Sequence, residues 1–186
     1  MSEPRNTRER IQQVAMELFS QQGYDRTSLR EIAEHLNVTK AALYYHFKTK
    51  EDIAASYFDD FNADVDKLYE WAAAQPSGIE TRREILRRYS DVMNTNGQTL
   101  RFIHHNQPAL REIGKGKNFK DRMNQLSRLL VSPDATPLQR LRGVDAIMTM
   151  HVAWFVELEG DPDPAELRAP ALRIALELIE ANEKPD

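Results

Sequence analysis

The sequence predicts an all-α protein of about nine helices, and three observations support that prediction. Apolar residues recur at intervals of three and four along almost the whole chain, which is the spacing of one face of a helix. No convincing stretch alternates apolar and polar residues as a half-buried strand would. Capping residues and proline or glycine stop signals separate the apolar stretches at distances typical of globular helices.

The first helix is expected from about residue 7 to residue 22. Its apolar face follows the positions i, i+3, i+4, i+7 and i+8. These positions are Ile11, Val14, Ala15, Leu18 and Phe19. Gly23 is expected to end the helix, because glycine adopts the left-handed conformation without a steric penalty.

Two short helices follow closely. Ser28 and Glu31 form a capping box that opens the second helix, whose buried stripe ends at Leu36. Asn37 is a plausible left-handed stop for it. Thr39 can cap a third helix over residues 40–47.

The rest of the chain divides at equally clear signals. Thr49 followed by Asp52 opens a fourth helix that persists to about residue 74, where the Pro-Ser-Gly sequence at 76–78 ends it. Further helices are expected around residues 85–93, 100–106 and 119–131, with a glycine-containing loop at 114–116. Thr136 and Asp163, each followed by proline and then by Gln139 or Glu166, start two final helices of about 20 residues each.

Composition excludes several classes of protein. The chain has no cysteine, which excludes a disulfide framework and a cysteine–zinc site. Its N-terminus, MSEPRNTRER, is charged from the start, and no stretch reaches the roughly 20 apolar residues of a membrane span. We therefore expect a soluble, cytoplasmic protein. The net charge of −4 lies beyond residue 54, yet a neutral N-terminal module can still bind phosphates if its cations share one face.

Residues 24–50 carry the strongest functional signal. Two helices joined by a tight turn, the second short and capped by threonine, describe a helix-turn-helix, although a plain helical hairpin has the same geometry. Within the short helix Leu43 and Phe47 can face the other helices, which leaves small and polar residues outward. Those outward residues are Lys40, Ala41, Ala42, Tyr44 and His46. Their hydroxyl, imidazole and ammonium groups suit phosphates and base edges.

The run TSLREIAEHLNVTKAALYYHFKTKEDI, preceded by AMELFSQQGYDRTS, resembles the DNA-binding signature of the TetR (tetracycline-repressor-like) family. The resemblance covers about residues 7–54, and LYYHFKTKE is among its most specific strings. It departs from the family pattern at two positions. Glycine is commoner at the position of Asn37, and glycine, serine or proline is frequent at the position of Ala41. The resemblance implies a three-helix DNA-binding domain at 1–54 and a larger helical ligand-binding and dimerisation domain at 55–186.

The resemblance also implies roles for matching residues. Tyr44 and Lys50 are expected to bind phosphates, and Ser28 and Arg30 to touch the DNA backbone or a base. Residues in or beside the major groove are expected to be Thr39, Lys40, Ala41, Tyr45 and His46.

The last two helices are apolar on more than one face, so packing inside one subunit covers only part of them. On the helix that begins at Pro137, one stripe holds Leu141, Val144, Met148, Val152 and Phe155. We expect the second stripe to face a partner in a homodimer, and the resemblance implies a four-helix bundle. The expected interface residues are Ile147, Trp154, Leu158, Ile174 and Leu178. Complete burial within one chain is the alternative.

Large and adaptable side chains in the middle helices could line an apolar ligand pocket, or could form an ordinary packed core. The resemblance favours a cavity. The candidate residues are Phe61, Trp71, Tyr89, Met93, Phe102, Met123, Met148, His151 and Phe155. No metal or other cofactor is expected, because the adjacent His104 and His105 cannot face one site and no carboxylate stands at ligand spacing.

These features together predict a dimeric repressor that binds a palindromic DNA operator and leaves it when an unknown small molecule binds. One alternative is a regulator without a small-molecule effector, controlled by a protein partner. A helical enzyme is the other alternative, and the sequence offers it no catalytic constellation: no glycine-rich phosphate loop, no HExxH and no evident Ser/His/Asp set.

Overall fold

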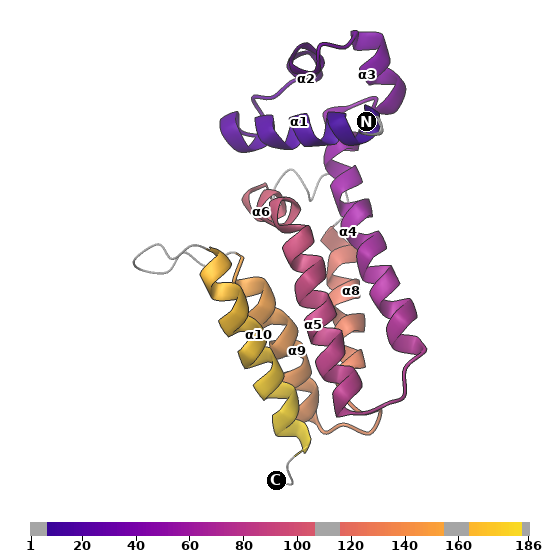
Figure 1. Cartoon of the computed structure of the whole chain (residues 1–186), viewed down its shortest axis with the longest axis vertical. Helices are drawn as coiled ribbons and strands as arrows, with labels where there is room; N and C mark the ends of the chain where they lie inside the picture. The colour runs from indigo at the N-terminus through magenta and orange to yellow at the C-terminus, as the bar shows by residue number, and fades with distance from the viewer. Residues whose placement is uncertain (1–6, 107–115, 155–163, 184–186) are drawn as a thin grey trace, which may run out of the picture. The chain divides into compact units, whose positions relative to one another are not determined.

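The structure, a computed structural model, describes residues 7–106, 116–154 and 164–183. Within these ranges it is all-helical, and its nine α-helices divide between two compact units (Figure 1). Of the described residues, 7–61 and 102–106 belong to the first unit and all others to the second. Helices α4 (Lys50–Ala73) and α6 (Gly97–His105) each supply residues to both units. The predicted all-α fold is confirmed.

The first unit is built on α1 (Thr7–Gln22), α2 (Leu29–Leu36) and α3 (Lys40–His46), with the beginning of α4. Each helix contributes an apolar stripe to one core. The side chains of Ile11, Ile32, Leu43 and Ile53 are 0% exposed there. Burial of such a side chain stabilises a fold by roughly 1.5–3 kcal/mol, so the short helices α2 and α3 depend on this shared core.

The helix boundaries in this unit follow the capping signals. The Ser28 hydroxyl accepts a hydrogen bond from the Glu31 N–H at 3.3 Å, while the Glu31 carboxylate accepts one from the Ser28 N–H at 2.8 Å. Gly23 and Asn37, the residues that follow α1 and α2, have φ angles of 91° and 53°. Both therefore adopt the left-handed conformation that ends a helix.

Phe102 belongs to the core of the first unit, which corrects its predicted place in a ligand pocket. Its ring stacks on Phe19 with centroids 5.3 Å apart and meets Tyr24 edge-on at 5.8 Å. Phe61 also belongs to this unit and is 0% exposed. The helical spacing of apolar residues indicates that Phe61 and Phe102 are buried. It does not indicate whether they belong to the core of the first unit or of the second.

The second unit contains the rest of α4 together with α5 (Ile79–Thr95), α8 (Gly116–Leu129), α9 (Pro137–Val152) and α10 (Pro164–Glu180). Helices α9 and α10 lie side by side, shown in orange and yellow in Figure 1. A short 3₁₀ helix, Ala181–Glu183, follows α10. Helix α5 begins before the predicted position 85, α8 begins within the predicted loop, and α9 is 16 residues long instead of about 20.

Polar contacts fasten the helices of the second unit to one another. Thr136 and Gln139 form the predicted capping box, with Pro137 in the first turn of α9. The Gln139 side chain also donates to the Asn182 carbonyl at 3.2 Å, which ties the start of α9 to the end of α10. Arg122 on α8 forms an ion pair with Asp66 on α4.

No helix in the described ranges is long and apolar enough to cross a lipid bilayer. Nor do three or more His, Asp or Glu side chains gather as metal ligands in that part of the chain. The side chains of His104 and His105 lie outside the described residues.

Candidate DNA interface

Helices α2 and α3 are joined by a turn of three residues, 37–39, whose geometry the backbone fixes. The Val38 N–H donates to the Ala33 carbonyl and the Asn37 N–H to the Glu34 carbonyl, both at 3.1 Å. Thr39 then begins α3, since its hydroxyl accepts a hydrogen bond from the Ala42 N–H at 3.2 Å. The two helices therefore form the predicted helix-turn-helix with both ends of the turn capped.

The orientation of α3 is set by two anchors. Leu43 is 0% and Phe47 4% exposed in the core of the first unit. The opposite face is open, with Thr39, Lys40, Ala41 and Tyr45 exposed to solvent. Because α3 has only seven residues, these two anchors determine which face it presents.

Tyr45 is the most exposed large hydrophobic side chain of the described residues, at 81%. Its ring meets only the edge of the neighbouring His46 ring, with centroids 5.2 Å apart. Tyr44 is half-buried, and the Lys40 ammonium lies 5.7 Å from its ring centroid. The face of α3 thus presents two phenols and one cation beside the small Ala41.

Lys50 was predicted to bind a phosphate, but its ammonium is used inside the chain. It donates to the carbonyl oxygens of Tyr24, Asp25 and Thr27 at 2.8, 3.2 and 3.4 Å. It also lies 4.4 Å from the centroid of the Tyr24 ring. An ammonium has three N–H donors, so the structure gives Lys50 the role of tying the start of α4 to the loop between α1 and α2.

Replacing Lys50 by methionine should therefore lower the free energy of unfolding by about 1.5–3 kcal/mol, the usual contribution of a hydrogen bond to a charged group. Lys48→Met is the matched control, because the exposed Lys48 ammonium donates to only one carbonyl, that of Tyr44. Urea unfolding of both variants measures the difference. A Lys50→Met protein as stable as the wild type would contradict this structural role of Lys50.

Ser28 and Arg30 both lie exposed at the front of α2. The Ser28 hydroxyl and backbone N–H hold the pKa of Glu31 below its ordinary value, so the carboxylate of the capping box stays charged at neutral pH. The Arg30 guanidinium pairs with Glu34 one turn on, at 2.7 Å, while its side chain remains 78% exposed. An exposed pair of this kind is weak, and Arg30 can exchange Glu34 for another anion.

The predicted dimer residues are only partly on the surface. Ile147 is 0% and Trp154 6% exposed, so both are covered within a single chain and their assignment to a subunit interface is wrong. Leu158 lies outside the described residues. On α10, Ile174 is 46% exposed and Leu178 is half-buried.

The other stripe of α9 is the exposed one. We call Leu141, Val144, Met148 and Val152 the α9 stripe; their exposed fractions are 56%, 36%, 43% and 49%. Gly143 explains why this stripe is exposed while the stripe with Ile147 is buried. A Cβ atom at position 143 would lie 2.8 Å from Val131 and 3.1 Å from the Ser127 carbonyl oxygen on α8. The close contact with α8 turns the side of α9 that bears Ile147 inward.

Within the second unit, the described residues that were predicted to line a pocket are only partly brought together. Tyr89, Met123 and His151 do meet: the Tyr89 hydroxyl lies 2.7 Å from His151 Nε2 and 3.3 Å from Met123 Sδ. Met148 instead belongs to the exposed α9 stripe, which corrects its predicted place. Trp71 packs under the Arg88 guanidinium, 4.0 Å from its ring, beside a surface groove. Phe155 lies outside the described residues.

His151 makes the stability of the second unit depend on pH. Burial lowers the pKa of His151 to about 4 from its ordinary 6.5, so the folded chain holds a neutral imidazole there. The unfolded chain binds this proton more tightly, and stability is lost as the pH falls through 6.5 towards 4.

We expect the His151 contribution to the unfolding free energy to fall by about 2 kcal/mol between pH 7 and pH 5. In His151→Gln, the difference in unfolding free energy between pH 7 and pH 5 should be smaller by that amount. Urea unfolding of both proteins at pH 7 and pH 5 measures this difference. Equal slopes for the two proteins would mean that the imidazole is charged, or accessible to water, in the folded chain.

Comparisons with known proteins agree with this geometry. Residues 11–57 match the family model described as bacterial regulatory proteins, tetR family. The transcriptional regulator AcrR of Shigella flexneri is 41% identical over 86 residues, which are 45% of this chain and 40% of AcrR. The negative transcriptional regulator IcaR of the biofilm operon icaADBC in Staphylococcus epidermidis is 37% identical over 78 residues, 34% of this chain and 42% of IcaR. The matches thus span less than half of these two relatives.

Solved structures extend the similarity to the whole fold. A transcriptional regulator from Aquifex aeolicus superposes with a TM-score of 0.71 at 24% identity, covering 94% of this chain and 99% of its own. A regulator of the TetR/AcrR family from Thermobifida fusca gives a TM-score of 0.59 at 25% identity, covering 92% and 97%. The all-α arrangement beyond the helix-turn-helix is therefore one that such regulators share. The N-terminal helix-turn-helix region of the chain, residues 11–57, is therefore a DNA-binding domain of the TetR family type.

Proposed function

We propose that this protein is a sequence-specific transcriptional regulator of the cytoplasm, which binds a palindromic operator as a homodimer and acts as a repressor. The observation that carries the proposal is the face of α3, where Lys40, Ala41 and Tyr45 are exposed while Leu43 is fully buried. The names of the relatives AcrR and IcaR are those of transcriptional regulators, which favours this role over catalysis.

Helix α3 is suited to enter the major groove. The small side chain of Ala41 lets the backbone approach base edges, and Lys40 can donate to guanine or to a phosphate. Tyr44 and Tyr45 supply hydroxyl groups for the phosphates on either side. Ser28 and Arg30, at the front of α2, are placed in this proposal on the DNA backbone, where a helix N-terminus favours anions.

Dimerisation rests on the α9 stripe together with Ile174 of α10. Five exposed apolar side chains on two packed helices form a surface larger than scattered exposed residues usually make. A two-fold axis through such a surface brings the same residues of both subunits together. Two copies of α3 would then read two half-sites of a palindrome.

A small molecule that releases the dimer from the operator is the second half of the proposal. The buried cluster of Tyr89, Met123 and His151 is the polar feature around which such a ligand would bind in the second unit. Because His151 is neutral, an uncharged ligand that exchanges hydrogen bonds with the phenol and imidazole fits this cluster better than an ion.

A regulator without a small-molecule effector, controlled by a protein partner, is the second candidate, and one observation favours it. The small cavity beside Met93, Met150 and Trp154 has a volume of only about 10 Å³, room for a single water molecule. A ligand would have to open this part of the interior. Screening a chemical library for compounds that release bound operator separates the two candidates.

The first experiment is selection from fragmented genomic DNA at moderate salt. Recovery of one or a few palindromic sites would support a sequence-specific dimer and would provide the operator for the ligand screen. Retention of all fragments, lost as salt rises, would leave only non-specific phosphate binding and would contradict the proposal.

Lys40→Ala should weaken binding to the selected operator by roughly tenfold and alter the recovered sequence at one position in each half-site. The selection repeated with this variant gives both quantities. A uniform loss with an unchanged consensus would assign Lys40 to a phosphate, and unchanged affinity would remove it from the interface.

A further inference from the structure

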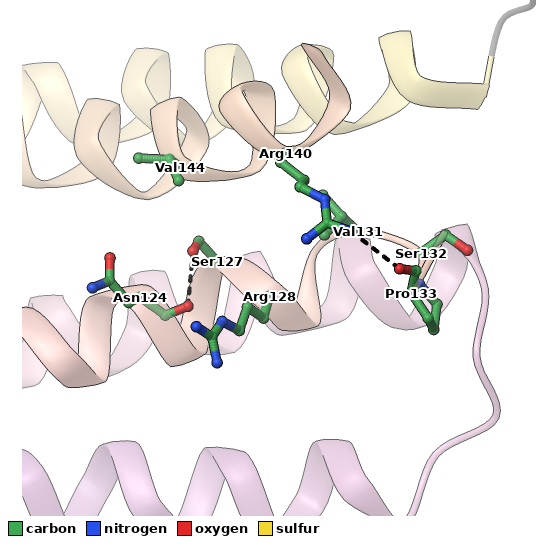
Figure 2. A pocket seen from close by; sticks show the side chains of 8 residues that line it. All are labelled: Asn124, Ser127, Arg128, Val131, Ser132, Pro133, Arg140 and Val144. Atoms are coloured by element: carbon green, nitrogen blue, oxygen red, sulfur yellow. Dashed lines mark hydrogen bonds between the residues drawn. The ribbon is translucent and has the colours of Figure 1, made fainter. Parts of the chain in front are cut away.

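A groove opens between α8 and α9 of the second unit (Figure 2). Its volume is about 650 Å³. Sites for small organic molecules have volumes of about 300–1,000 Å³. The groove is therefore large enough for a small ligand.

Helical spacing places the walls of the groove. Asn124, Ser127 and Arg128 line the α8 side, three and four residues apart, so they share one face of that helix. Arg140 and Val144 line the α9 side, again four residues apart. In Figure 2 the loop that carries Pro133 closes one end between the two helices.

Each wall brings an arginine, and no residue that lines the groove is acidic. Arg140 is held in place by hydrogen bonds to the Ala135 carbonyl at 2.9 Å and the Pro133 carbonyl at 3.3 Å. A guanidinium has five N–H donors, so three remain on Arg140. Arg128 is exposed and forms no ion pair with another described residue.

The rest of the lining is partly apolar. Val144 on α9 and Val131, just beyond the end of α8, supply aliphatic side chains, and Pro133 adds an aliphatic ring at the closed end. Ser127 is buried, and its hydroxyl donates a hydrogen bond to the Asn124 carbonyl at 3.0 Å. The Ser127 hydroxyl is therefore already satisfied within the chain. Two guanidinium groups beside aliphatic surface match an organic anion better than a bare inorganic one.

We propose that the groove between α8 and α9 binds a small organic carboxylate, with its carboxylate on Arg128 and Arg140 and its apolar body against Val131 and Val144. None of the groove residues belongs to α3 or to the buried cluster around His151, and only Val144 is shared with the α9 stripe. This site goes beyond the proposed function and does not depend on it.

The groove borders the α9 stripe through one residue. Successive residues of a helix are about 100° apart, so Arg140 and Leu141 project in different directions and Val144 lies between them. The charged end of the groove therefore lies off the surface proposed for dimerisation, and Val144 belongs to both.

Three probes test the site on the full-length protein without DNA, by isothermal titration and ligand-observed NMR. The probes are 2-naphthoate, its uncharged analogue 2-naphthamide, and inorganic phosphate. We expect 2-naphthoate to bind at least about tenfold more tightly than either of the others, since only it combines a charge-assisted hydrogen bond with an apolar body. Arg128→Gln should weaken 2-naphthoate binding by roughly tenfold or more.

Arg87→Gln is the matched control, because Arg87 is an arginine on α5 whose side chain is 51% exposed and does not line the groove. Equal affinity for naphthoate and naphthamide would exclude recognition of the carboxylate charge. Equal affinity for naphthoate and phosphate would exclude a contribution from the apolar part of the ligand. Absence of saturable naphthoate binding, or the same affinity in Arg128→Gln as in wild type, would overturn the proposal. Because no DNA is present, none of these results bears on the regulator function.

Discussion

Replacing Met148 by aspartate should convert the proposed dimer into a monomer and lower its affinity for the selected operator by at least about a hundredfold. Met148 lies in the middle of the α9 stripe and is 43% exposed in the single chain. In a two-fold symmetric interface the substitution buries two carboxylates without partners, and each costs several kcal/mol. The separated subunits then bind half-sites independently and lose the effective concentration that linkage provides.

Analytical ultracentrifugation measures the first effect, and titration of the selected operator measures the second. Met148→Leu is the control, since it keeps an apolar side chain of similar volume and should remain dimeric. Circular dichroism should show unchanged helix content in both variants, because position 148 is exposed in one chain. A Met148→Asp protein that sediments as a dimer would place the interface elsewhere.

Replacing Ala41 by glutamate should abolish specific operator binding, with a loss of at least about a hundredfold, while the fold and the dimer are unchanged. Ala41 is exposed on α3, so the folded chain accommodates the larger side chain. At the proposed interface the same side chain blocks the close approach of α3 to base edges. It also adds a negative charge beside the phosphates, whose attraction for cations dominates DNA affinity.

Ala73→Glu is the matched control, because it adds the same side chain at an exposed position on α4 outside the proposed interface. Its operator affinity should stay near that of the wild type, so a large loss would point to net charge as the cause. Operator titration at two salt concentrations separates the steric effect from the electrostatic one. Normal binding by Ala41→Glu would exclude α3 as the recognition helix.

Much of the first unit could be predicted from the sequence because local signals determine it. The Ser28 capping box, the left-handed Asn37 and the Thr39 cap all act within four residues of the chain, and each lies where its motif predicted. The turn and both helix starts then leave Leu43 as the inward residue of α3. A short helix with one large aliphatic anchor leaves its opposite face exposed, and that face is the one we propose for DNA.

The role of Lys50 could not be predicted in the same way. Its acceptors are carbonyl oxygens more than 20 residues earlier in the chain, in a loop whose course depends on the packing of α1 against α2. An ammonium at a helix start suits either a phosphate or a carbonyl cluster. Only the packing of the loop against α4 decides between them.

By itself the sequence determined the all-α class, the helix-turn-helix and the resemblance of residues 11–57 to the TetR family. Capping, periodicity and a specific local motif are all properties of neighbouring residues. The tertiary structure alone decided which stripe of α9 is exposed. Both stripes have the helical period and similar hydrophobicity, so no pattern within α9 distinguishes them. Gly143 lets α8 approach on one side, where Ile147 becomes buried, and Met148 is left on the surface. Such a contact joins residues of two helices, and its side therefore depends on how the helices pack.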